Sequence, residues 1–122
     1  MALKALTAHL RSAAPWGVQV SVEVEATGSP FLATVDGPAY RAMGAAMQEA
    51  YGAPMVSLGQ GGSIPLCNVF TDTYPDAEII LMGVEEPQAL IHAPNESVDP
   101  QELSAMALAE ALFLQRYAAE AR

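Results

Sequence analysis

Residues 18–25, VQVSVEVE, alternate apolar and polar side chains without interruption. Because a period of two places successive side chains on opposite faces of a β-strand, the segment predicts a strand with one buried and one solvated face. Two shorter apolar runs, 53–58 and 78–84, predict further strands. The second run is almost continuously apolar, which is typical of an inner strand that is covered on both faces.

Four other segments carry the apolar spacing of three and four residues that predicts amphipathic helices. They span about 2–14, 38–51, 65–74 and 100–119. Asp36 is expected to cap the second of these helices and Gly52 to end it. Asp99 to Glu102 form a capping box at the start of the last helix.

The order of these elements predicts an α/β fold. After residue 37 the chain reads helix, strand, loop, helix, strand, loop, helix, which is an α/β layer pattern. Before residue 26 there is one helix and one strand, which cannot close a hydrophobic core alone. We therefore predict a boundary near residue 33, with 1–33 and 34–122 belonging to different domains, and a partner for the first.

Charge and composition exclude several classes of partner. The 122 residues include 14 Asp and Glu against 5 Lys and Arg, a formal net charge of −9. Nucleic acids and anionic membranes both require a basic surface, so we expect neither as a partner. No signal peptide or membrane-length apolar run is present, which favours a cytoplasmic protein. The single cysteine, Cys67, excludes an intramolecular disulfide and is expected to be a buried thiol.

The stretch GQGGSIPL, residues 59–66, places three glycines between a predicted strand and a predicted helix. This arrangement can point free backbone N–H groups at an anion, and Ser63 could add a hydroxyl. The stretch lacks the Gly-Lys-Ser/Thr of a phosphate-binding P-loop and the third glycine of a dinucleotide fingerprint. A tight turn with close packing between strand and helix is the alternative interpretation.

His92 lies in a loop after a predicted inner strand, where α/β proteins commonly build their sites. A structural or merely exposed histidine is the alternative. A zinc site needs three or four ligands, and this chain has two histidines and one cysteine. Glu85, Glu86 and Glu96 have no metal-binding spacing. The chain is therefore not expected to complete a zinc site by itself.

Three stretches taken together resemble a known family. GGSIP (61–65), YPDAEIILMGVEEP (74–87) and IHAPNESV (91–98), followed by a long helix, resemble the C-terminal end of the zinc-dependent aminoacylase, carnosinase and desuccinylase family of metallopeptidases, and its dipeptidase branch most closely. The resemblance implies an α/β catalytic domain that holds two metal ions, usually zinc, with an inserted ferredoxin-like lid. Residues 1–33 would be the last helix and strand of that lid, which is the dimerisation domain.

The resemblance also implies roles for individual residues. His92 matches the family's final metal ligand, and Asn95 and Glu96 would fix the histidine loop. The substrate's terminal carboxylate would be held by the loop formed by Gly61, Gly62, Ser63 and Ile64. Gly59 and Gln60 stand where many relatives carry arginine and an acid, so the charge of this loop differs.

The other metal ligands and the general base of the family have no counterpart in these 122 residues. We therefore predict the C-terminal part of a metal-dependent hydrolase of dipeptides or N-acyl amino acids, inactive alone. Its partner would be the N-terminal part of the same enzyme, and exposed apolar faces would cause self-association. The alternatives are a free-standing α/β module that binds a small carboxylate or phosphate, and a degraded remnant without function.

Overall fold

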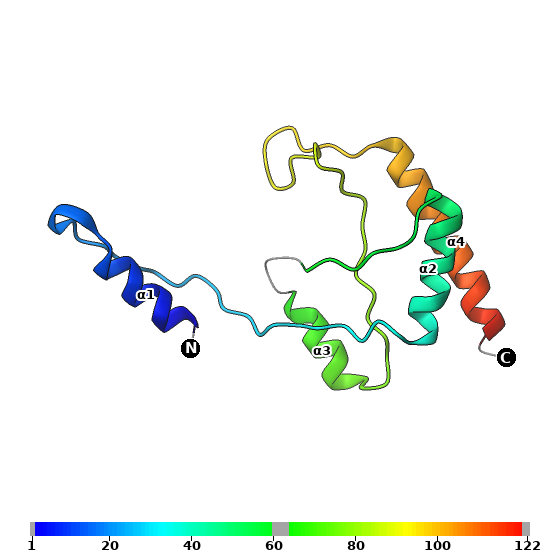
Figure 1. Cartoon of the computed structure of the whole chain (residues 1–122), viewed down its shortest axis with the longest axis horizontal. Coiled ribbons are helices and arrows are strands. Elements are labelled where there is room, and N and C mark those ends of the chain that lie inside the picture. Colours follow the sequence, from blue (N-terminus) through cyan, green and yellow to red (C-terminus); the bar gives the residue numbers. More distant parts are fainter. Residues whose placement is uncertain (1, 60–63, 121–122) are drawn as a thin grey trace.

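Two helices, α2 (Pro38–Tyr51) and α4 (Pro100–Glu120), form the packed centre of the protein. In this computed structural model, which describes residues 2–59 and 64–120, the two helices lie side by side and run in opposite directions (Figure 1). Arg116 on α4 forms an ion pair with Glu49 on α2. Most of the buried side chains come from these helices: Ala39, Tyr40, Ala42, Met43, Ala46, Met106 and Ala109.

The remaining helices are shorter and lie outside this pair. They are α1 (Ala2–Ser12), the single 3₁₀ turn η1 (Pro15–Gly17) and α3 (Pro65–Thr73). No residue of α1 is buried, and Figure 1 shows this helix projecting away from the other three. On α3 the one buried residue is Cys67, 3% exposed, which confirms the buried thiol. All four predicted helices are present within two residues of their expected ends.

The prediction of an α/β fold is wrong. Over residues 2–59 and 64–120 the regular structure is helical, with no strand and no sheet. The segments 18–25, 53–58 and 78–84 have no regular structure, and Leu81 is 55% exposed where an inner strand would bury it. Side-chain alternation describes the faces of a strand but supplies no partner for its backbone. These segments do not pair with one another, so their pattern does not become a sheet.

The start of α2 is capped from a distant part of the sequence. Its N-cap residue is Gly37, and the predicted cap, Asp36, makes no side-chain capping bond. Instead, Glu78 Oε1 accepts a hydrogen bond from the Ala39 amide at 2.9 Å, and Glu78 Oε2 accepts one from the Tyr40 amide at 3.1 Å. A carboxylate at this position satisfies free N–H groups and complements the positive end of the helix dipole.

Two other predicted helix ends agree with the structure. Gly52 adopts a left-handed conformation, φ 70°, and its amide donates to the Gln48 carbonyl, which ends α2. Asp99 Oδ1 accepts a hydrogen bond from the Gln101 amide at 2.8 Å and caps α4. Both ends depend on neighbouring residues only.

The protein exposes far more surface than a closed globule of its mass. Its accessible area is 9788 Å², roughly 3,500 Å² more than the size scaling of folded monomers gives for 12.8 kDa. The exposed side chains include large apolar ones, such as Trp16 at 95%, Leu58 at 77% and Leu114 at 65%. Among the described helices, none combines the length and apolar character needed to cross a bilayer. The excess area is larger than the roughly 800 Å² that each partner contributes to a standard protein–protein interface.

Candidate functional site

The histidine loop, residues 89–97, is built from consecutive tight turns. The Ala93 amide donates to the Leu90 carbonyl at 2.9 Å, and the Glu96 amide donates to the Ala93 carbonyl at 3.2 Å. The two turns, 90–93 and 93–96, share Ala93. The Ser97 amide then donates to the Ala89 carbonyl at 3.0 Å, which closes the segment at its base. A loop without regular structure, as the sequence predicts, is therefore held in a defined shape by its own backbone.

Three residues of this loop adopt a left-handed backbone conformation. Their φ angles are 54° for Leu90, 60° for His92 and 66° for Asn95. His92 and Asn95 each occupy the third position of a turn, where a type II turn requires positive φ, and Pro94-Asn95 is the favoured pair for its centre. Leu90 and His92 carry full side chains in a region that costs about 1–2 kcal/mol for ordinary residues. Such conformations persist where the surrounding structure over-determines them, and they cluster at functional sites.

The proposed metal and loop residues are accessible but do not form a metal cluster. His92, Asn95 and Glu96 are all exposed. Nowhere in the described part of the chain do three or more His, Cys, Asp or Glu side chains gather as they must to hold a metal ion. Because a zinc ion needs three or four ligands, these residues do not fit a complete zinc site. His92 can serve as one ligand only.

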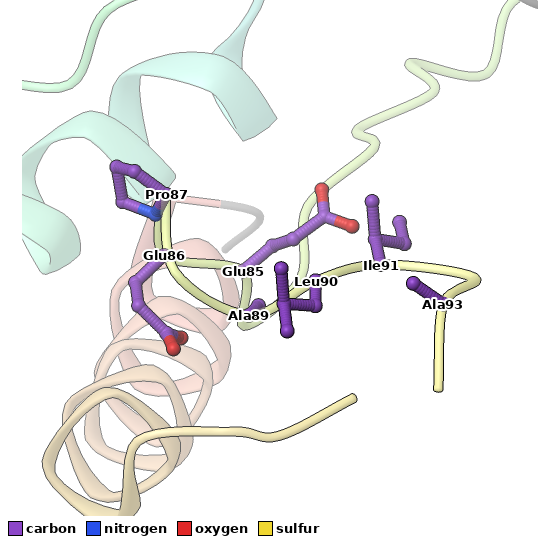
Figure 2. A pocket seen from close by; sticks show the side chains of 7 residues that line it. All are labelled: Glu85, Glu86, Pro87, Ala89, Leu90, Ile91 and Ala93. Carbon is purple, nitrogen blue, oxygen red and sulfur yellow. The ribbon is translucent and has the colours of Figure 1, made fainter. Parts of the chain in front are cut away.

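An open pocket of about 480 Å³ lies at the base of the histidine loop. Leu90, Ile91 and Ala93 line it from the loop, and Glu85 and Glu86 line it from the preceding segment. Figure 2 shows the two carboxylates pointing away from each other, so they do not form the close pair that shared acid–base chemistry needs. Within the described structure Glu86 Oε2 is buried and has no hydrogen-bond partner.

The substrate-carboxylate loop lies mostly outside the described residues, since Gly61, Gly62 and Ser63 are among those that the structure does not describe. Ile64 is described: it is the N-cap of α3, it is 50% exposed, and its carbonyl accepts the Cys67 amide at 3.0 Å. In Figure 1 the start of α3 and the yellow histidine loop are separate segments of the backbone. Among the described residues, no backbone hydrogen bond links Ile64 to the histidine loop.

Two tyrosines of α2 have raised pKa values, and neither lies in the histidine loop. Burial, followed by the negative charge of Glu78, raises the pKa of Tyr40 above its usual value of 10.0. Burial, followed by the negative charge of Glu102, raises the pKa of Tyr51 in the same direction. Both phenols therefore stay protonated at neutral pH.

Nearly the whole chain has a counterpart in a known enzyme. Over 115 residues, which are 93% of the chain, it is 44% identical to a cysteinylglycine-S-conjugate dipeptidase of Corynebacterium striatum. This chain is similar to part of a dipeptidase. It spans about a quarter, 25%, of the length of that curated relative. No family model and no solved structure matches the chain.

Sequence reasoning missed the residues that hold the histidine loop and α2 in place. Glu78 was assigned only to a strand, because a cap 39 residues away in sequence has no local signal. Ala89 and Ser97 close the histidine loop through backbone atoms. Almost any residue type has these atoms, so the two residue types give no sequence signal. The Pro-Asn pair at 94–95 was the one visible sign that a tight turn lies in this loop.

Proposed function

We propose that this chain is the C-terminal part of a metal-dependent dipeptidase of the aminoacylase, carnosinase and desuccinylase family. The identity of 44% across 93% of the chain carries this proposal. The exposed area supports it, because a chain with roughly 3,500 Å² of surplus surface suits a component of a larger protein better than a free-standing module. His92 also supports it, because it is exposed and lies in a tight turn. A histidine in that position is accessible to a metal ion whose other ligands come from a different part of the enzyme.

In this proposal each part of the site has one role. His92 supplies one ligand to a site for zinc, whose other ligands come from the N-terminal part of the same enzyme. Asn95 and Glu96 keep the histidine loop in its shape, and the substrate's terminal carboxylate is held by the loop of Gly61, Gly62, Ser63 and Ile64. When bound, the metal would supply Lewis-acid chemistry for amide hydrolysis. The substrate class is a dipeptide or an N-acyl amino acid.

The first experiment assays the isolated chain for hydrolysis of a panel of dipeptides, with and without added zinc. We expect no turnover under either condition, because the described residues contain no group of three or more His, Cys, Asp or Glu side chains that could hold a metal ion. Metal-dependent turnover by the chain alone would overturn the proposal that it is an incomplete part of an enzyme.

Calorimetry separates the proposal from a free-standing binding module. We expect neither zinc nor free amino acids to bind the isolated chain with micromolar affinity, because the site is shared with residues outside it. Micromolar binding of an amino acid or of inorganic phosphate without zinc would instead favour the module.

A further inference from the structure

Ala89 anchors the histidine loop at its base. It is 4% exposed, whereas every residue from 90 to 100 is exposed. Its amide donates to the Glu86 carbonyl at 3.0 Å and its carbonyl accepts the Ser97 amide at 3.0 Å. One buried residue therefore joins the turn that precedes the loop to the residue that ends it, and Figure 2 shows it beside Glu86 at the base of the pocket.

The hydrogen bond between Ser97 and Ala89 fixes where the loop residues lie. The segment between them consists of the two turns that share Ala93, and each turn has a defined span. With both ends tied to the same residue, the position of the His92 backbone relative to the buried Ala89 is determined. If this bond is absent, the two turns remain but their end is free, and the entropy of the open segment favours other arrangements.

We propose that Ala89 and the backbone amide of Ser97 form a neck that positions His92. Both take part through backbone atoms, so they are positioning residues that act through the loop. The effect of the neck on activity rests on the proposed function of His92. The effect of the Ser97–Ala89 hydrogen bond on the shape of the loop does not, so the two effects are tested separately.

Closure of the neck is tested in the full chain with two substitutions at one position. Ser97→Pro removes the N–H donor, whereas Ser97→Ala keeps it and loses only an exposed hydroxyl. We expect the ¹H–¹⁵N signals of His92 and Ala93 to move in Ser97→Pro and to stay within the line width in Ser97→Ala, with the signals of α2 and α4 unchanged in both.

A second substitution keeps the test decisive if Ser97→Pro perturbs more than the neck. Ala89→Leu adds three carbons at a buried position and should displace the same loop signals by overpacking. Ala53→Leu makes the same change at an exposed position outside the loop, is the control, and should leave the signal of His92 in place. Unchanged His92 signals in both Ser97→Pro and Ala89→Leu would overturn the proposed neck.

The consequence for activity is tested in a chimera, in which this chain replaces the matching segment of the Corynebacterium striatum dipeptidase. We expect Ser97→Pro to lower kcat by about tenfold or more with a smaller change in KM, the range seen when groups that orient a metal ligand are removed. Ser97→Ala should stay within about twofold. Full activity of Ser97→Pro overturns the neck, whereas full activity of His92→Ala overturns the proposed function instead.

Discussion

Tyr40 and Glu78 are joined through the first turn of α2: the Tyr40 amide donates to Glu78 Oε2 at 3.1 Å. The same tyrosine donates its hydroxyl proton to the Ile79 carbonyl at 2.7 Å. One residue of α2 thus contacts two consecutive residues of a segment 38 and 39 positions away. This contact, more than any sheet, ties residues 78–84 to the helical core.

Removing the Glu78 carboxylate should destabilise the protein. We expect Glu78→Ala to lower the free energy of unfolding by about 2 kcal/mol, because two hydrogen bonds to a charged acceptor are lost at a helix N-terminus. Glu85→Ala removes a neighbouring exposed carboxylate and should change stability by less than about 0.5 kcal/mol. Urea denaturation followed by circular dichroism measures both. Equal effects of the two substitutions would show that the cap contributes nothing.

Gly37 should be coupled to Glu78. A Cβ atom added at Gly37 would overlap the Glu78 carboxylate, so Gly37→Ala must push the cap away from the helix. We expect Gly37→Ala to cost about 1–2 kcal/mol in the natural sequence and much less in a Glu78→Ala background. A double-mutant cycle measures this difference. Simple additivity of the two substitutions would contradict the overlap.

Alkaline pH should weaken the helical core through Tyr40. Its pKa is raised in the folded state, so its contribution is complete below the unfolded value of about 10 and is lost as the pH rises through the folded pKa. We expect Tyr40→Phe to be less stable by about 1 kcal/mol at pH 7, because the bond to Ile79 is lost. The variant should lose less stability than the natural chain above pH 10. Parallel pH dependences of the two proteins would rule out this role.

Asn95 should tolerate glycine better than alanine. At φ 66° a residue without a Cβ atom is unstrained, whereas alanine costs about 1 kcal/mol. We therefore expect Asn95→Gly to keep the His92 NMR signals in place and Asn95→Ala to shift them. The opposite order would mean that the Asn95 side chain, and not its backbone conformation, shapes the loop.

The surplus surface should make the isolated chain self-associate. We expect its mass in light scattering to rise with concentration, and Leu114→Lys to reduce this rise, because Leu114 is 65% exposed on α4. Gln115→Lys adds the same charge at the next exposed position and is the control. A clean monomer at high concentration would count against the prediction.

How far the sequence determined these features depends on the range of the interactions. The helices were predicted because apolar spacing, Gly52 and the Asp99 cap all act within a few residues. The strands were predicted wrongly, because a strand needs a partner that its own alternation does not specify, and 18–25 finds none in the described structure. The cap by Glu78 is likewise invisible to local reasoning, since the contact joins positions 39 and 38 residues apart.

The site was predicted unevenly for similar reasons. The loop character of 88–98 follows from the lack of periodicity, and the structure shows loop and turns there. The left-handed conformation of Leu90 has no sequence signal, because leucine does not favour positive φ, whereas histidine and asparagine are both enriched there. The role of Gly61, Gly62 and Ser63 stays a prediction, since they lie outside the described residues.

The most direct test of the central proposal is the hydrolysis of a cysteinylglycine S-conjugate by the chimera in which this chain replaces the matching segment of the Corynebacterium striatum dipeptidase. We predict zinc-dependent turnover within about tenfold of the parent enzyme, and a loss of at least about a hundredfold for the chimera with His92→Ala. A folded chimera without activity, or one that is unaffected by His92→Ala, would contradict the proposal.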